Sequence, residues 1–415
     1  MSKIASLFSG QGSQYIGMGK NLYDKFDIVK KTYETANEIL GFDLKSMCFE
    51  DSKNELSKTE NTQPAILTTS VAQFRAYMEQ KGEIPNFLAG HSLGEYSALV
   101  CAEAIDFVDA LKLVRLRGKL MQESAENSKG TMAAIRNFDE KVVQEECSKL
   151  SSQGIVIGIA NYNALNNVVI SGDASAVELL SKMFKDKGAE VIKLNVSGAF
   201  HSKLMEPAAI KLKYELLKYV FKDPKYTILS NVSALPYKSR DEIIGNLSEQ
   251  IVKPVKWKSI MKYLDKNNID SVVEFGPKAV LRNIFRNNIT RIKAYSYDKE
   301  EDLEEMKSEY IIEGEKKVYS IISRSLGIAV CTKNNNWNNE EYEKGVVEPY
   351  KRIEKIQEVL SSTGEEPTVE QMNMAVEMLK SVFKTKKTPK EEQIQRFNQL
   401  FRESNSYKYF HDFQI

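Results

Sequence analysis

Gly90-His91-Ser92-Leu93-Gly94 is the stretch that decides the fold of this 415-residue chain. The apolar segment Phe87-Leu88-Ala89 precedes it as the end of a strand, and a helical pattern begins at Glu95. Glycines on both sides of the serine remove the Cβ atoms that would clash in a sharp strand-to-helix turn. The N–H of Leu93 then points to where an oxyanion would form. The pattern predicts Ser92 as a nucleophile in an α/β, hydrolase-like core with a parallel sheet. An ordinary glycine-rich turn is the alternative.

A serine nucleophile needs a base within hydrogen-bond reach. The sequence contains three histidines, His91, His201 and His411. His91 lies beside Ser92 in the bend, so its side chain should point away from the serine, and His411 lies near the C-terminus. His201 follows a strand-like segment and precedes a helical one, in the kind of loop where catalytic groups lie. By elimination His201 is the predicted base, and a structural histidine is the alternative.

A second glycine-rich loop follows the first predicted strand, Lys3 to Phe8. Its sequence is Ser9-Gly10-Gln11-Gly12-Ser13-Gln14. Open α/β sheets bind ligands at the carboxyl ends of their strands. The main-chain N–H of Gln11 is therefore a candidate second oxyanion donor, beside that of Leu93. A solvent-exposed loop that merely needs two glycines is the alternative.

Arg117 lies on the apolar stripe of a predicted helix, three residues after Val114 and four before Met121. A guanidinium that points into the core needs a partner, because an unpaired buried charge is unstable. A substrate carboxylate held by two parallel hydrogen bonds is one such partner. A salt bridge to an internal acid and snorkelling to solvent are the alternatives. No acidic residue carries a motif that marks it as a third triad member.

The pattern along the chain predicts three regions. Residues 1–129 and 197–297 alternate strand-like and helical segments and form the larger α/β core. Residues 130–196 follow the order β-α-β-β-α-β, which predicts a ferredoxin-like small domain inserted into that core. Residues 298–415 are more charged and include helix-start signals such as the capping box at Thr368, so a helical C-terminal extension is expected.

The composition argues against several classes of function. A net charge of +1 gives no whole-chain attraction to nucleic acid or to an anionic membrane, and no segment has the apolar length of a membrane span. The four cysteines stand far apart without a CxxC or Cys/His cluster, so neither a metal site nor a disulfide framework is expected. No signal-peptide pattern is present, and a reducing cytoplasm is the expected location.

Five segments together resemble the malonyl-CoA:acyl carrier protein transacylase family, over about residues 1–290. They are Gly10-Gln11-Gly12-Ser13-Gln14, Gly90-His91-Ser92-Leu93-Gly94-Glu95, Arg115-Leu116-Arg117-Gly118, Gly198-Ala199-Phe200-His201-Ser202 and Glu274-Phe275-Gly276-Pro277. The resemblance implies transfer of a malonyl group from malonyl-CoA to the phosphopantetheine thiol of an acyl carrier protein. The reaction would pass through a seryl ester and would need neither a metal nor a bound cofactor.

The resemblance also implies a role for each site residue. Ser92 would be the acylated nucleophile and His201 its base, and the oxyanion hole would come from Gln11 and Leu93. Arg117 would bind the malonyl carboxylate.

Three further residues enter the site through the resemblance alone. Gln250 would fix the histidine, chiefly through its main-chain carbonyl. Phe200 looks like the malonyl-selecting form of its position rather than the form that accepts branched extender units. Asn161 would also line the site.

The C-terminal extension departs from the housekeeping members of the family. With its Asn-Trp-Asn-Asn stretch at residues 336–339, it is similar to the discrete acyltransferases that serve polyketide synthases, which makes synthase modules expected partners. Docking to such a synthase and packing on the core are the two alternatives for these helices. For the whole chain, a hydrolase that strips acyl groups from carriers and a docking protein built on a spent enzyme remain the alternatives. A hydrolase would have no use for Arg117.

Overall fold

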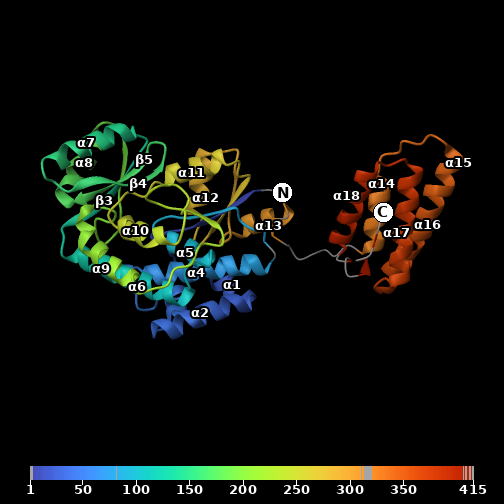
Figure 1. Ribbon diagram of the computed structural model, residues 1–415, viewed down its shortest axis with the longest axis horizontal. Coiled ribbons are helices and arrows are strands. Elements are labelled where there is room, and N and C mark those ends of the chain that lie inside the picture. The colour runs from blue at the N-terminus through green and yellow to red at the C-terminus, as the bar shows by residue number, and fades with distance from the viewer. Residues whose placement is uncertain are drawn as a thin grey trace. The chain divides into compact units, whose positions relative to one another are not determined.

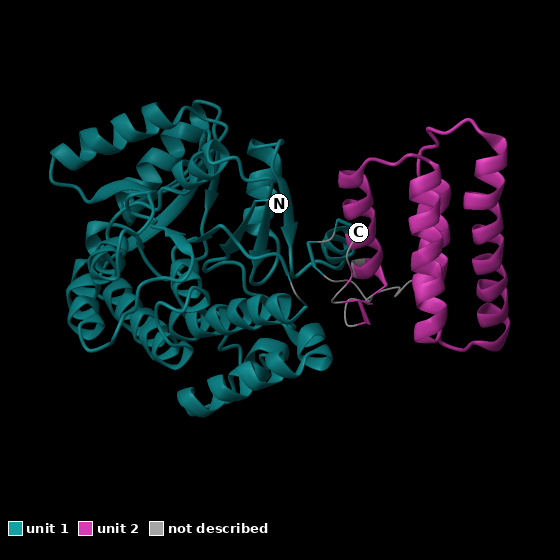
Figure 2. Ribbon diagram, turned by 45° about the vertical axis from the view of Figure 1, so that its right-hand side comes forward, with its two compact units in different colours: residues 1–314 teal, residues 315–415 magenta. Residues whose placement is uncertain are grey.

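A computed structural model of the chain separates into two units (Figures 1 and 2). The larger unit comprises residues 1–314 and the C-terminal unit residues 315–415. The structure describes residues 3–80, 82–309, 311–312, 320–404, 406, 409–410 and 413. Within those residues, no helix combines the length and apolar character needed to cross a membrane.

The larger unit is built on a parallel sheet of five strands in the order β7-β2-β1-β8-β9. The strands are β1 (Ile4–Phe8), β2 (Phe87–Gly90), β7 (Thr227–Leu229), β8 (Ser271–Phe275) and β9 (Lys293–Ser296). β1 and β8 are buried along their whole length, as strands of a parallel sheet are when both faces are covered. Phe8 pairs with Gly90, so the carboxyl ends of β1 and β2 lie side by side. The loops that carry Gln11 and Ser92 therefore leave the sheet next to each other.

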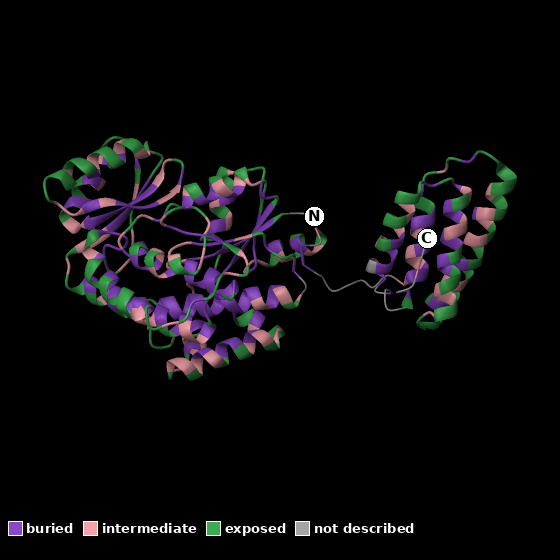
Figure 3. Ribbon diagram, in the orientation of Figure 1, coloured by how far each residue is buried: buried purple, intermediate pink, exposed green. Residues whose placement is uncertain are grey.

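Helices surround this sheet. They are α1 (Lys20–Lys25), α2 (Asp27–Leu40), α3 (Leu44–Phe49), α4 (Thr59–Glu79), α5 (Gly94–Cys101), α6 (Phe107–Glu126), α9 (Glu206–Leu216), α10 (Asp241–Gln250), α11 (Trp257–Lys266), α12 (Val280–Asn288) and α13 (Glu300–Ser308), with a 3₁₀ turn η1 (Lys203–Met205). Almost all of α4 and the whole of α5 are buried (Figure 3). Since α5 starts at the Ser92 bend and packs against β1, β2, α4 and α6, the core fixes the position of the serine.

The second sheet is antiparallel, in the order β4-β5-β3-β6. Its strands are β3 (Gly130–Arg136), β4 (Ile157–Ala164), β5 (Asn167–Asp173) and β6 (Glu190–Lys193), and the helices α7 (Glu140–Ser152) and α8 (Ala174–Asp186) pack on it. This chain order and strand order together are the ferredoxin-like arrangement. The predicted fold class is confirmed: an α/β core with a parallel sheet, an inserted β-α-β-β-α-β layer, and additional C-terminal helices.

The inserted sheet joins the core next to the Ser92 bend. The main-chain N–H of Tyr162 donates to the carbonyl of Val255 at 2.9 Å, and the N–H of Val255 donates to the carbonyl of Ala160 at 2.8 Å. His91 Nε2 lies 3.0 Å from Asn163 Oδ1, so the bend itself contacts β4. These contacts set the position of the inserted sheet relative to the serine.

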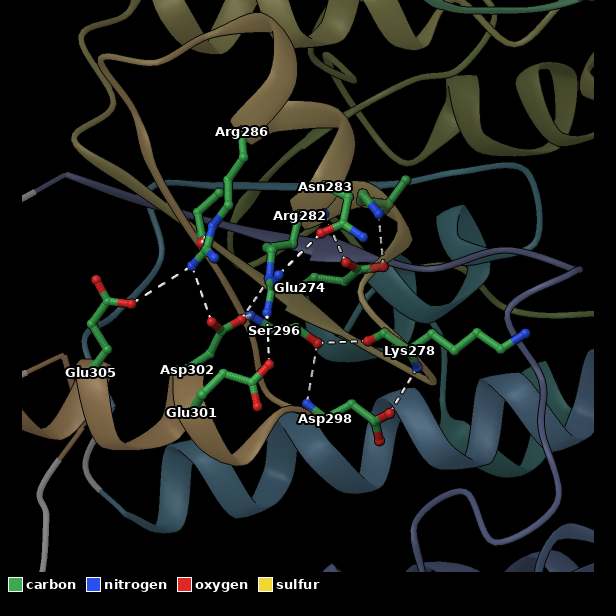
Figure 4. Close-up of polar contacts among 12 residues, drawn as sticks. Glu274, Lys278, Arg282, Asn283, Arg286, Ser296, Asp298, Glu301, Asp302 and Glu305 are labelled. Carbon is green, nitrogen blue, oxygen red and sulfur yellow. Dashed lines mark hydrogen bonds and ion pairs between the residues drawn. The ribbon is translucent and has the colours of Figure 1, made fainter.

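The C-terminal extension starts later than the sequence predicts, because the larger unit continues past residue 298 to residue 314. α13 packs on β9, and its Asp302 is buried against α12 (Figure 4). Asp302 accepts from Arg282 Nε at 2.8 Å, from Arg286 Nη2 at 3.0 Å and from the N–H of Ser296 at 2.7 Å. The charged composition that suggested a boundary here instead forms an ion-pair cluster with the core.

We expect Asp302→Ala to lower the free energy of unfolding of the larger unit by about 3 kcal/mol, because Arg282 would lose a buried counter-charge. Urea unfolding followed by circular dichroism measures this loss. Glu301→Ala is the matched control, since Glu301 also contacts Arg282 but is 69% exposed, and a much smaller loss is expected there because solvent screens an exposed ion pair. Equal losses in the two variants would contradict a buried anchor at α13.

The C-terminal unit has its own apolar core, in which Leu379, Phe383 and Phe397 are buried. Its helices are α14 (Ile321–Cys331), α15 (Asn339–Tyr342), α16 (Glu348–Thr363), α17 (Val369–Thr385) and α18 (Lys390–Glu403), with a π-helical turn η2 (Glu343–Val347) ahead of α16. The predicted capping box is present at the start of α17, where Thr368 and Gln371 exchange hydrogen bonds. The unit is thus a helical bundle that buries its own apolar residues.

Candidate active site

Ser92 lies at the turn between β2 and α5, with a φ of 51° in the left-handed region. A Cβ atom on Gly90 would overlap the main chain of Gly94, and one on Gly94 would overlap the carbonyl oxygen of Phe8. Both glycines are therefore sterically required. A non-glycine residue held at positive φ is strained, and such strain collects at functional sites. The bend presents the Ser92 hydroxyl in the way the sequence motif predicts.

Ser92 and His201 meet although 109 residues separate them: Ser92 Oγ lies 2.9 Å from His201 Nε2. His201 is buried in the loop between β6 and η1. Its Nδ1 lies 2.7 Å from the main-chain oxygen of Gln250. A carbonyl oxygen can only accept, so the proton of the neutral imidazole is on Nδ1 and Nε2 is free to accept from the serine. His411, the third histidine, lies outside the described residues.

The His201 imidazole is held in its neutral form. Burial and, secondly, the nearby Arg117 guanidinium lower the pKa of His201 to about 3. A general base must be unprotonated to act, so this environment keeps His201 ready to accept a proton at neutral pH.

We expect the ring C–H signals of His201 in NMR spectra to stay constant as the pH falls from 8 to 5. The charged form appears only as the pH falls through the pKa, which lies well below the ordinary value of about 6.5. The signals are assigned by their loss in His201→Ala. A titration midpoint near pH 6.5 for these signals would contradict the buried, neutral base.

Arg117 extends from α6 into the same site and is 1% exposed. Its Nη2 donates to Ser92 Oγ at 3.1 Å and to Gln250 Oε1 at 3.0 Å, and its Nη1 donates to Gln63 Oε1 at 2.8 Å. These bonds use three of the five guanidinium N–H groups. The acceptors of these bonds are amide and hydroxyl oxygens. The salt bridge between Arg117 and an internal acid, one of the alternatives from the sequence, is therefore not found among the described residues.

The loops of Gln11 and Leu93 touch beside the serine. The N–H of His91 donates to the carbonyl of Phe8 at 3.0 Å, and a Cβ atom on Gly10 would overlap the carbonyl oxygen of His91. Neither the Gln11 N–H nor the Leu93 N–H has a hydrogen-bond acceptor among the residues that the structure describes. Two unpaired N–H groups on adjoining loops are what an oxyanion hole requires.

Phe200 and Asn161 are buried, and among the described residues neither makes a polar contact with Ser92 or His201. A cavity of about 320 Å³ opens beside His201. Residues 154–159, residues 201–203, Val252 and Pro254 form most of its lining, which includes neither Phe200 nor Asn161.

The site contains polar residues that the sequence did not single out. Asn231, after β7, accepts from the N–H of Ser92 at 2.7 Å and donates to the carbonyl of Gly90 at 2.7 Å, so it holds both sides of the bend. Gln63, within the buried face of α4, binds Arg117. Glu95 and Tyr237 form a further buried pair, joined at 2.5 Å. Of these four residues, only Gln63 has a local signal that could have marked it as a site residue, because it is a polar side chain within a buried helix.

Residues 6–312 match the family described as acyl transferase domain. The malonyl CoA-acyl carrier protein transacylase of Bacillus subtilis is 35% identical over 399 residues, which cover 95% of this chain and 99% of the relative. A protein of the same description from Escherichia coli K12 is 39% identical over 295 residues, covering 71% of this chain and 95% of the relative. This chain belongs to the malonyl CoA-acyl carrier protein transacylase family. The family predicted from the sequence is thereby confirmed.

Solved structures of the transacylase family have the same fold. FabD from Acinetobacter baumannii superposes with a TM-score of 0.71 at 37% identity, covering 74% of this chain and 98% of that one. A malonyl-transacylase solved in complex with a type II PKS acyl-carrier protein gives a TM-score of 0.70 at 37% identity, covering 73% of this chain and 98% of that one. The Bacillus subtilis transacylase, in contrast, aligns with 95% of the chain and so extends into the C-terminal unit.

Proposed function

We propose that this chain transfers the malonyl group of malonyl-CoA to the phosphopantetheine thiol of an acyl carrier protein, through an ester on Ser92. One observation carries the proposal: Ser92 Oγ lies 2.9 Å from His201 Nε2 and 3.1 Å from Arg117 Nη2. A nucleophile, a neutral base and a buried cation that can bind the malonyl carboxylate thus meet at one oxygen. Relatives described as malonyl CoA-acyl carrier protein transacylases, at 35% and 39% identity, support it.

In the first half-reaction, His201 Nε2 takes the proton of Ser92 as Oγ attacks the thioester carbon. The N–H groups of Gln11 and Leu93 hold the oxyanion of the tetrahedral intermediate. The carbon–sulfur bond then breaks, and His201 returns the proton to the coenzyme A sulfur. In the second half-reaction the carrier thiol gives its proton to His201 and attacks the ester, and Ser92 Oγ leaves and takes that proton back. The main-chain carbonyl of Gln250 keeps His201 in the required tautomer.

Arg117 accounts for the choice of a malonyl donor. A substrate carboxylate can accept from the remaining guanidinium N–H groups and can replace Ser92 Oγ on Nη2 once the ester has formed. A donor without a carboxylate would leave this buried cation without an anionic partner. The arginine therefore favours transfer of a carboxylated acyl group over hydrolysis of acyl carriers.

The cavity beside His201 is the proposed passage for the pantetheine arm, because it opens at the base and has apolar walls from Ile157, Ile159 and Val252. Phe200, adjacent to His201, is proposed to limit the size of the acyl group. Asn161 is proposed to line the site from β4, where it lies beside Val255 of the core.

Incubation with labelled malonyl-CoA and a phosphopantetheinylated carrier protein tests the proposal. Label on the carrier that requires the enzyme is the expected result, and the unmodified carrier without its pantetheine arm is the control. Release of free malonate at the same rate with and without carrier would contradict transfer and support the hydrolase alternative.

We propose further that the carrier belongs to a polyketide synthase and that residues 315–415 help to bind it. The relative solved with a type II PKS acyl-carrier protein supports this partner class, and the separate core of the C-terminal unit supports an independent role. Comparing the full chain with residues 1–314 for carrier affinity and melting temperature tests it. A lower melting temperature with unchanged affinity would assign these helices to stability instead.

We propose that the protein works in a reducing cytoplasm, as expected from the sequence. All four cysteines are unpaired thiols, three of them buried. Unpaired cysteines are the usual state in a compartment that keeps thiols reduced.

A further inference from the structure

Glu95 lies in the first turn of α5, three residues after the serine, and is 1% exposed. Its carboxylate accepts from Tyr237 Oη at 2.5 Å, from Gln250 Nε2 at 2.6 Å and from the N–H of Asn231 at 3.3 Å to either oxygen. Among the described residues it forms no hydrogen bond with Ser92 Oγ or His201, so the transfer mechanism above gives it no role. Burying a carboxylate is unfavourable, so a buried Glu95 held by three donors close to the reacting serine suggests a functional role.

Gln250 connects Glu95 with the reacting groups. Gln250 Nε2 donates to Glu95 and also to the carbonyl of Ser92 at 3.0 Å. Gln250 Oε1 accepts from Arg117 Nη2 at 3.0 Å. The two ends of one amide group thus face a buried anion and a buried cation.

The orientation of this amide follows from the chemistry of its neighbours. An ionised carboxylate can only accept, and a guanidinium can only donate. The amide nitrogen must therefore face Glu95 and the amide oxygen must face Arg117. The carbonyl of Ser92, which can only accept, favours the same orientation of the amide. Without its charge Glu95 would hold the amide nitrogen less firmly, because a hydrogen bond to a charged acceptor is stronger than one to a neutral acceptor.

The surroundings of Glu95 determine the pH at which it is charged. Burial raises the pKa of Glu95 to about 7, while the bonds from Tyr237, Gln250 and Asn231 and the charge of Arg117 act in the opposite direction. Tyr96, next along α5, interacts with both Glu95 and Arg117, Tyr237 interacts with Glu95, and His201 interacts with Arg117. A carboxylate with this pKa is ionised at pH 8, so the tests below are made at that pH.

We propose that Glu95 is a positioning residue of the malonyl site: its carboxylate fixes the Gln250 amide, which in turn holds the Arg117 guanidinium toward Ser92 in the orientation that receives a substrate carboxylate. This inference deepens the proposed malonyl transfer and rests on it. Glu95 acts on selectivity for the carboxylated donor rather than on the serine–histidine pair, because His201 depends on the main-chain carbonyl of Gln250 and not on its side chain.

Glu95→Gln tests the proposal, since it keeps the shape of the side chain and removes the charge that holds the amide nitrogen of Gln250. Single-turnover loading of Ser92 by malonyl-CoA and by acetyl-CoA is followed by intact-protein mass spectrometry. Malonyl loading should fall on the order of tenfold, as for loss of a hydrogen bond to a charged group, and acetyl loading should fall much less. The malonyl-to-acetyl ratio is therefore the quantity that changes, and a merely structural role would lower both rates alike.

Glu274→Gln is the matched control. Glu274 is also a fully buried carboxylate, and burial raises its pKa to about 8. It accepts from the N–H groups of Leu281 at 3.1 Å and Arg282 at 2.8 Å at the start of α12 (Figure 4), and in the described structure it forms no hydrogen bond with Gln250. Its loss should lower the melting temperature and leave the malonyl-to-acetyl ratio unchanged.

Gln250→Met provides a second, independent variant, because methionine has a similar size and keeps the main-chain carbonyl but cannot bond to Glu95 or Arg117. It should lower the ratio as Glu95→Gln does, and combining the two substitutions should lower it no further. An unchanged ratio in Glu95→Gln, an equal change in Glu274→Gln, or additive losses in the double variant would each overturn the role of Glu95. If the wild-type protein does not take up malonyl at all, the proposed function fails instead.

Discussion

Ser92→Ala is expected to lower malonyl transfer to the carrier by about 10⁴- to 10⁶-fold, the range seen when a serine nucleophile is removed. Ser92 Oγ is the hydroxyl that lies 2.9 Å from the free nitrogen of His201, and the strained bend at Ser92 directs it there. Without this oxygen no ester can form, and the oxyanion donors alone have no nucleophile to assist. The transfer rate from labelled malonyl-CoA to the carrier measures the loss.

Ser97→Ala is the control for this substitution. Ser97 is buried on α5, the helix that follows the Ser92 bend, and its hydroxyl has no hydrogen-bond partner in the described structure. Its removal should leave the transfer rate near that of the wild-type protein. Transfer by Ser92→Ala at a rate comparable with Ser97→Ala would mean that another group carries the acyl chain.

Arg117→Ala is expected to cost malonyl transfer about 2–5 kcal/mol, the usual loss when one partner of a buried charged pair is removed. This corresponds to a decrease of about 30- to 5,000-fold in kcat/KM for malonyl-CoA. Acetyl loading should fall far less, because an acetyl group has no carboxylate for the guanidinium to bind. The kcat/KM of Arg117→Lys for malonyl-CoA should lie between those of the wild-type protein and Arg117→Ala. An ammonium group keeps the charge but cannot bind a carboxylate through two parallel bonds.

Arg115→Ala is the matched control for Arg117. Arg115 belongs to the same turn of α6, but its guanidinium lies 4.4 Å from the centre of the Phe42 ring. Its removal should leave the ratio of malonyl to acetyl loading unchanged. An equal loss of malonyl and acetyl loading in Arg117→Ala would contradict the carboxylate role of Arg117.

The sequence predicts those parts of the site that local sterics impose. Glycine is required at Gly90 and Gly94 because any larger residue would overlap neighbouring main chain, so the motif predicts both the turn and the position of the serine in it. His201 could be predicted as the base for a different reason, because the sequence contains only three histidines. The roles of Ser92 and His201 remain predictions, which the Ser92→Ala variant and the pH titration of His201 test.

The sequence could not reveal the polar groups that hold this site together. Asn231, Tyr237 and Gln63 come from separate segments, and their function depends on which other side chains the fold brings near them. Glu95 is adjacent to the motif, yet a glutamate in the first turn of a helix is common on protein surfaces. Only its burial distinguishes it, and burial is a property of the folded chain.

The extension boundary illustrates the same limit. The charged residues from 298 onward are compatible with a solvated linker or with ion pairs to a neighbouring helix, and composition alone does not distinguish the two. Asp302 settles the question in the structure because two arginines of α12 bind it. Pairing between distant residues is not encoded in any local pattern.

Mapping the acyl-enzyme by tandem mass spectrometry tests the central claim most directly. In the first sample, the wild-type protein is mixed with malonyl-CoA alone and then digested. In a second, parallel sample, a phosphopantetheinylated carrier is added to the protein and malonyl-CoA before digestion. The account predicts one malonyl group on Ser92 in the first sample and its appearance on the carrier thiol in the second. A malonyl group on a different residue, or a Ser92 adduct that the carrier does not remove, would contradict it.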